Sequence, residues 1–293
     1  MYATILVPLD GSPFSEKALP YAMRLAQAAG GRVVLIRSVD NPHTNTAEAA
    51  LEATAGRLKW LGAPAVTGVY HAEVTEAIER ATVDYQADLI VMATHGRSDV
   101  GRWFYGSVTD RVVRSADVPV LVVPGQCGRE WPADRGHRFR LLIPLDGSEF
   151  SKEALGQAAL LDELFRTEVL LVHVVEPINP LFGSGYSLAE LNPDLRATAA
   201  QALLYRTAGP LRKDGRRVEV RTPIGDVGTT IAKVAREERS DLVIMATHGA
   251  GGLERAVMGS TAAAMTHLSP VPVLFVRPSA LAGRCQARKA IAR

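Results

Sequence analysis

Short apolar runs alternate with amphipathic stretches along the first 125 residues of the chain. Runs of aliphatic and β-branched residues predict five strands, at residues 4–8, 33–39, 65–69, 89–93 and 120–123. The first stretch between them has the spacing of a helix capped by Ser12 or Ser15 and ended by Gly30-Gly31. Its apolar positions are Ala18, Tyr21, Ala22, Leu25 and Ala26. The same periodicity predicts helices at residues 48–61 and 74–85, and another that begins near Ser107.

The second half of the chain repeats this pattern. The sequence ILVPLDGSPFSEKAL, which begins at Ile5, returns as LLIPLDGSEFSKEAL 136 residues later, at Leu141. The sequence DLIVMATHG, which ends at Gly96, returns as DLVIMATHG 153 residues later, at Gly249. The second half therefore carries 17 extra residues between these landmarks. We expect them at residues 177–193, where Pro, Gly, Asn and Ser cluster without periodicity.

Strand-helix alternation with five strands per half predicts an α/β fold. We expect two tandem, doubly wound, five-stranded parallel-sheet domains of the Rossmann-like type, at residues 1–125 and 139–278, with a linker at 126–138 and a tail at 279–293. Each fifth strand, at 118–123 and 271–276, contains a proline and is therefore placed at an edge of its sheet. Pairing of these two edges would make the chain an intramolecular pseudo-dimer.

Composition excludes several classes of protein. The 33 basic and 31 acidic side chains give a formal net charge of only +2, which is not typical of a nucleic-acid-binding protein. Cys127 and Cys285 have neither disulfide-framework nor zinc spacing. We find no signal-peptide pattern and no apolar run near the roughly 18 residues that suggest a membrane span. We therefore expect a cytoplasmic protein with neither a nucleic acid nor a membrane as its partner.

A glycine loop follows the fourth strand in both halves. Nine residues separate Gly96 from Gly106 and Gly249 from Gly259, and a serine that opens a helical pattern follows each second glycine. In a doubly wound sheet this loop lies at the carboxyl edge, where ligands bind, and the N–H groups of a helix start suit phosphate. At the same edge lie the ends of the first two strands, with a carboxylate after the first. A nucleotide fits: backbone groups at Ser38 and Val174 read adenine, Asp10 or Asp146 holds the ribose or a metal, and the helix starts hold the phosphates.

Each of these features also has a structural interpretation. The glycines can simply stop a strand and start a helix, and Ser107 and Ser260 can be N-caps. The two aspartates can cap a helix or hold a turn. His95 and His248 have no nucleophile or second base at a fixed offset, which favours a structural role in the loop. The aromatic residues at 103–105 have no counterpart in the second half, which favours packing over adenine stacking.

The repeated pattern resembles the universal stress protein family in its tandem form, over nearly all of both halves. ATP-binding members carry Gly, two residues, Gly, nine residues, Gly and then Ser or Thr, and a Pro-x-Asp after the first strand. Here Ala93 and Ala246 replace the first glycine, a substitution that is tolerated where φ is negative and costs energy where φ is positive.

The resemblance implies an ATP-binding regulator of the stress response, with Mg or Mn accompanying the nucleotide, an unidentified protein partner, and a homodimer of whole chains as a further assembly. It implies nucleotide-binding positions in both halves. These are Pro8, Leu9, Asp10, Ser38, Met92, Ala93, Gly96, Arg97, Gly106, Ser107, Val108 and Thr109 in the first half, and Pro144, Leu145, Asp146, Val174, Met245, Ala246, Gly249, Gly259, Ser260 and Thr261 in the second.

Two other functions use the same architecture. A slow ATPase or an adenylating enzyme would need machinery for in-line attack or pyrophosphate release. The chain has no Walker motif, no Ser-Gly-Gly-x-Asp-Ser loop and no dinucleotide fingerprint after the first strand, so we predict no catalytic residue and no resident metal site. A flavoprotein similar to electron-transfer flavoproteins shares the fold class, and an absorbance scan for flavin would distinguish it.

Overall fold

The computed structural model describes residues 2–39, 45–94, 107–128, 131, 136–178, 192–247 and 258–277. In the first half a short 3-10 turn, Ser15–Ala18, precedes the first helix, so α1 begins later than either serine cap predicts. The elements of this half are β1 (Thr4–Pro8), α1 (Leu19–Ala29), β2 (Arg32–Ser38), α2 (Asn45–Trp60), β3 (Ala65–Tyr70), α3 (Val74–Asp84), β4 (Leu89–Ala93), α4 (Ser107–Ser115) and β5 (Val120–Val123). The apolar periodicity correctly predicted the five strands to within one residue at each end.

The second half repeats this order. Its elements are β6 (Phe139–Pro144), α5 (Glu149–Asp162), β7 (Thr167–Val172), α7 (Pro193–Lys213), β8 (Arg217–Arg221), α8 (Val227–Glu237), β9 (Leu242–Ala246), α9 (Ser260–Leu268) and β10 (Val273–Val276). Here Ser148, the counterpart of Ser12, caps α5 by accepting a 3.2 Å hydrogen bond from the backbone N–H of Ser151.

The 17 extra residues of the second half lie before the end of its second helix. Trp60 and Lys213, which end α2 and α7, are already 153 residues apart, as the glycine loops are. Five of the extra residues lengthen the helix, because α7 has 21 residues where α2 has 16. Most of the predicted insertion, at residues 179–191, lies outside the described residues.

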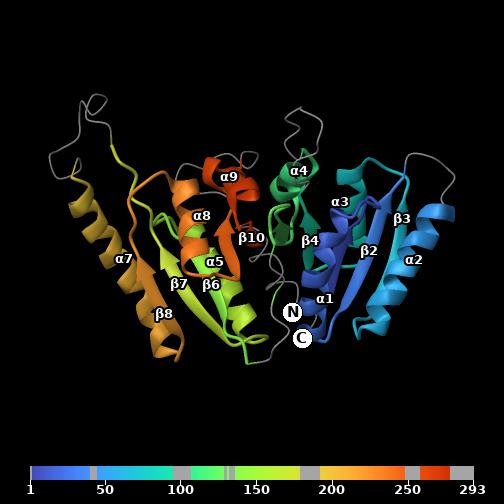
Figure 1. The fold of residues 1–293 in the computed structure, drawn as a ribbon, viewed down its shortest axis with the longest axis horizontal. Helices are drawn as coiled ribbons and strands as arrows, with labels where there is room; N and C mark the ends of the chain where they lie inside the picture. Colours follow the sequence, from blue (N-terminus) through green and yellow to red (C-terminus); the bar gives the residue numbers. More distant parts are fainter. Residues whose placement is uncertain are drawn as a thin grey trace, which may run out of the picture.

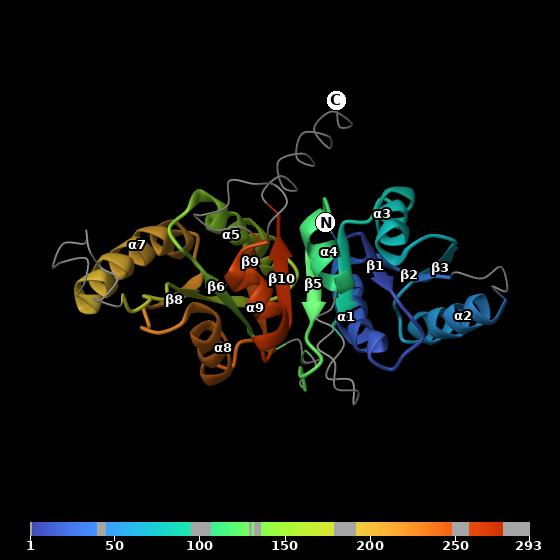
Figure 2. The ribbon, with the colours of Figure 1, turned by 90° about the horizontal axis from the view of Figure 1, so that it is seen from above.

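The ten strands form one continuous sheet in the order β3-β2-β1-β4-β5-β10-β9-β6-β7-β8. All strands within each half are parallel, and among the described strands the one antiparallel contact joins β5 to β10. Buried residues of α1, α2, α5 and α7 share one core against one face of the sheet, and those of α3, α4, α8 and α9 share a second core against the other. Figures 1 and 2 show α4 and α9 over the central strands, with the two halves related by an approximate two-fold axis. The predicted pseudo-dimer is confirmed.

The junction between the halves begins with the edge strands. Val122 pairs with Val273 and Leu121 with Leu274, and all residues of β5 and β10 are buried. On the face that carries α1 and α5, Tyr2 donates a hydrogen bond to Gln157 of the other half. Pairing removes two strand edges that would otherwise expose a row of unsatisfied backbone groups.

Trp131 completes the junction. The indole is only 9% exposed, and its ring meets those of Tyr21, Phe139 and Phe165 at centroid distances of 5.1, 5.4 and 6.3 Å. Its Nε1 donates a 2.9 Å hydrogen bond to the carbonyl of Asp241. This residue of the predicted linker therefore packs into the core between the halves.

None of the helices within the described ranges has both the length and the apolar character that crossing a bilayer would require.

Candidate functional site

The candidate site lies where the strand order of each half reverses. β1 pairs with β4 only at Ile5↔Leu89 and Leu6↔Ile90, although both strands continue further. The second half repeats this, because β6 pairs with β9 only at Leu141↔Leu242 and Leu142↔Val243. The strands therefore separate toward their carboxyl ends, between crossovers that pass to opposite faces of the sheet. Open α/β sheets bind ligands in such a crevice.

An aspartate-glycine turn follows the first strand at this crevice. Asp10 Oδ1 accepts a 2.7 Å hydrogen bond from the backbone N–H of Ser12, and Asp146 Oδ1 accepts one of 2.9 Å from that of Ser148. The glycines that follow have φ of +85° and +88°, a left-handed conformation that a side chain would strain. The carboxylates therefore hold the turn, which was the structural alternative, and both aspartates remain exposed at the crevice.

Backbone groups become accessible to a ligand at the end of the second strand. Ser38 lies two residues beyond Ile36, the last residue of β2 that pairs with β1, and its hydroxyl donates to the carbonyl of Ala72 at 2.5 Å. Val174 likewise lies two residues beyond Val172, the last residue of β7 that pairs with β6. The side of each strand that faces the crevice is thus no longer covered by a neighbouring strand.

Arg37, before Ser38, is cationic, and His173, before Val174, is titratable. The sequence analysis identified neither as a site residue. A Cβ atom at Gly11 would lie 2.9 Å from a guanidinium nitrogen of Arg37, so this cation packs against the aspartate turn. His173 is its counterpart 136 residues later. Burial lowers the pKa of His173, and nearby Arg196 acts in the same direction, while contacts with Leu145 and Asp146 act against it. The 136-residue offset between the repeats is the sequence signal that pairs Arg37 with His173.

The alanines that replace the family's first glycine are accommodated without strain. Ala93 and Ala246 are the last residues of β4 and β9, where they pair with Val123 and Val276. Neither has a positive φ. The backbone at this position therefore does not require glycine, and any effect of the methyl group on a ligand is one of space.

The start of α9 differs from the starts of four other helices. Glu73, Ser148, Asn192 and Asp226 cap α3, α5, α7 and α8 with side-chain oxygens. No side chain of the described residues caps α9, which begins after Gly259, and Ser260 at its first position is exposed. Gly259 itself donates a 2.9 Å hydrogen bond to the carbonyl of Thr247. An uncapped first turn presents N–H groups to an anion.

The predicted nucleotide-binding residues differ in how far their side chains are buried. Six of their side chains are buried, so these positions offer a ligand at most their backbone: Leu9, Met92, Thr109, Leu145, Met245 and Ala246. Pro8 and Pro144 end β1 and β6, while Val108 and Thr261 are partly exposed at the starts of α4 and α9. Ser107 is the first residue of α4.

The remaining predictions lie outside the described residues. These are Gly96, Arg97, Gly106 and Gly249, together with His95, His248 and residues 103–105, to which we assigned structural roles.

Comparison with known proteins identifies the repeat. The model of the "Universal stress protein family" matches residues 1–124 and 137–277. A universal stress protein of Synechocystis is 24% identical over 93% of this chain and 99% of its own length, and one of Thermus aquaticus is 35% identical over 42% of this chain and 99% of its own length. Two mycobacterial relatives, from Mycolicibacterium smegmatis and Mycobacterium bovis, are 28% and 26% identical, and the matches cover 67% and 64% of their length.

Solved structures share the fold. A universal stress protein from Archaeoglobus fulgidus superposes with a TM-score of 0.69 at 20% identity and covers 94% of this chain and 99% of its own. A protein from Pseudomonas aeruginosa, described as a putative universal stress protein, gives 0.67 at 15% identity over 99% of this chain and 98% of its own. These matches span both halves, which supports the tandem arrangement.

Proposed function

Because the chain belongs to the universal stress protein family, we propose that each half binds one adenine nucleotide, ATP with Mg²⁺ or Mn²⁺. In this proposal the bound nucleotide regulates association with a protein partner in the stress response. The observation that carries the proposal is the uncapped start of α9 at the crevice between β6 and β9. Four other helices satisfy N–H groups of their first turn with side chains, whereas α9 does not; α1 also lacks such a cap, but it continues from a 3-10 turn. Phosphate is the natural partner of such a helix start.

The residues that are present fit such a nucleotide. In the second half the N–H groups at Ser260 and Thr261 would hold phosphate oxygens, and the backbone at Val174 would hydrogen-bond the adenine edge. Asp146 would bind the ribose or the metal that accompanies the triphosphate. Ser38 and Asp10 offer the same groups in the first half. When bound, the nucleotide would supply charge and contacts at these positions, so the protein itself needs no chemical step to act as a regulator.

Titration calorimetry with ATP and MgCl₂ tests the binding proposal directly. Two nucleotides per chain are expected, and adenosine, which has no phosphates, should bind more weakly. A stoichiometry of zero would refute the proposal, and a stoichiometry of one would show that only one half binds. Mass spectrometry of the small molecules released from denatured, freshly purified protein provides an independent measurement.

The regulatory part of the proposal has its own test. Proteins that co-purify with a tagged chain should differ from those recovered with a variant that no longer binds ATP, because a regulator requires a partner that distinguishes the two states. If both chains recover the same proteins in the same amounts, nucleotide-dependent association is wrong even where ATP binds.

A further inference from the structure

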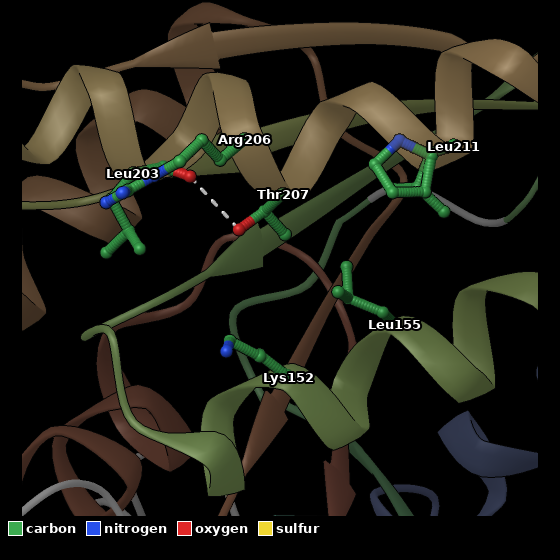
Figure 3. Close-up of a pocket in the computed structure, with 7 residues that line it drawn as sticks. Lys152, Leu155, Leu203, Arg206, Thr207 and Leu211 are labelled. Carbon is green, nitrogen blue, oxygen red and sulfur yellow. Dashed lines mark hydrogen bonds between the residues drawn. The ribbon is translucent and has the colours of Figure 1, made fainter.

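A groove lies between α5 and α7, on the face of the sheet that these two helices cover (Figure 3). It has a volume of about 550 Å³, within the range of small-molecule sites. Lys152 and Leu155 of α5 line one wall, and residues of α7 line the other: Leu203, Arg206, Thr207, Pro210 and Leu211. None of these residues belongs to the proposed nucleotide sites.

The groove has an apolar floor and two cations at its walls. Leu155 and Leu211 are partly buried and pack against the core. Among the described residues, Lys152 pairs only with the exposed Glu149 of its own helix, at 2.6 Å, and no ion pair holds Arg206. An exposed ion pair of this kind contributes little, so Lys152 stays available to a ligand. The groove thus has one cationic side chain on each of its two helices, beside leucine side chains.

The first half of the chain is an internal control for this arrangement. The sequence TAGPL at Thr207 matches TAGRL at Thr54, which aligns α7 with α2 at an offset of 153 residues. The counterparts of Lys152 and Pro210 are Glu16, in the 3-10 turn before α1, and Arg57 of α2, and their side chains form a 3.0 Å ion pair. At the counterparts of Leu203 and Arg206 stand alanines, Ala50 and Ala53. The half that keeps the ion pair has small neutral residues where the other has leucine and arginine.

We propose that the α5–α7 groove binds a linear aliphatic carboxylate, with its chain along Leu155, Leu203 and Leu211 and its head group between Lys152 and Arg206. The charge complementarity favours an anion over a neutral ligand, because a carboxylate accepts charge-assisted hydrogen bonds from ammonium and guanidinium groups. The apolar floor favours an alkyl chain over a small inorganic anion. Pro210 has no side chain that could reach across to α5, so the groove between the helices stays open.

Calorimetric titration of the full chain with decanoate, below the concentration at which it forms micelles, tests this assignment. One decanoate per chain is expected, and decanol should bind about tenfold more weakly because it lacks the charge. The double variant Lys152→Gln/Arg206→Gln should lose decanoate affinity by about the same factor. Lys213→Gln, which removes one positive charge from an exposed position of α7 outside the groove, should bind like the original chain.

A second variant reproduces in the groove the ion pair that Glu16 and Arg57 form in the first half. Lys152→Glu/Pro210→Arg should restore an ion pair across the helices and abolish decanoate binding, with a melting temperature at or above that of the original chain. The proposal is overturned if decanoate shows no saturable binding, if decanol binds equally well, or if the double glutamine variant binds as the original does. Two equivalents of decanoate would also overturn it, since the ion-paired half would then bind as well.

Discussion

The ring of Trp131, from the segment between the two repeats, stands edge-on against the ring of Tyr21 in the first half, with centroids 5.1 Å apart and planes at 87°. The same indole packs on Phe139 and Phe165 of the second half. Arg24 adds a further contact between halves, because its guanidinium lies 5.7 Å from the Phe165 ring centroid. The segment that joins the repeats thus contributes to the core.

Replacing Trp131 with alanine should lower the free energy of unfolding by about 3–5 kcal/mol, since it removes a buried aromatic ring and leaves a cavity. Urea denaturation followed by circular dichroism measures this change. Trp60→Ala is the matched control, because that indole is 86% exposed and its removal should change stability by about 0.5 kcal/mol or less. Equal effects of the two substitutions would contradict the packing role of Trp131.

Residues 1–125 expressed alone should form a homodimer. In the full chain β10 covers the edge of β5, and removal of the second half exposes this Val-rich edge to a second copy. Analytical ultracentrifugation should find a species that sediments nearly like the full chain, which is the natural reference because two halves have almost its mass. A soluble monomer at high concentration would show that the edge does not need a partner.

Gly259→Val should remove one of two bound nucleotides. Gly259 has φ of −59° and ψ of 146°, which valine adopts without strain, so the substitution should leave the fold intact and act by filling the space beside the start of α9. The calorimetric stoichiometry should fall from two to one. Gly128→Val is the control, because a Cβ atom there would have no neighbour within 4 Å. Unchanged stoichiometry in the Gly259 variant would place the phosphates elsewhere.

Stability should fall as the pH drops below about 6.5, the ordinary pKa of histidine. Burial holds the pKa of His173 below this value, so between the two pKa values the unfolded chain binds more protons than the folded one. The loss should level off below the folded-state pKa. Urea denaturation at pH 7.5 and 5.5 should show a smaller decrease for His173→Gln than for the original chain, whereas the exposed His71→Gln should match the original chain. Equal decreases in all three chains would contradict the assignment.

The fold was predictable from sequence because its signals are local and occur twice. The runs at Ile5 and Leu141 share the same turn chemistry, and the offsets between landmarks placed the insertion between the Leu141 run and Gly249; the structure narrowed it to the part before the end of α7. The start of the first helix was not predictable to the residue. Ser12 and Ser15 both satisfy a capping pattern, and the choice of a 3-10 turn before Leu19 depends on packing.

The position of the candidate site was predictable from the sequence, but the roles of its residues were less so. Period and spacing located Asp10 and Ser38 at one sheet edge, but they left open whether the carboxylate of Asp10 holds a turn or binds a ligand. Arg37 and His173 were missed because they differ in type, and only their positions in the repeat connect them. The buried Trp131 was missed because a lone aromatic residue in a polar segment carries no periodicity.

The antiparallel contact between β5 and β10 also determines which molecules the chain can assemble with. A single-domain protein that pairs through its fifth strand can exchange subunits with its relatives. Here the partner strand is part of the same polypeptide, so an incoming strand would have to displace a neighbour present at high effective concentration. The two halves therefore remain in a fixed one-to-one ratio, and each is free to diverge without ever meeting a copy of itself at this edge.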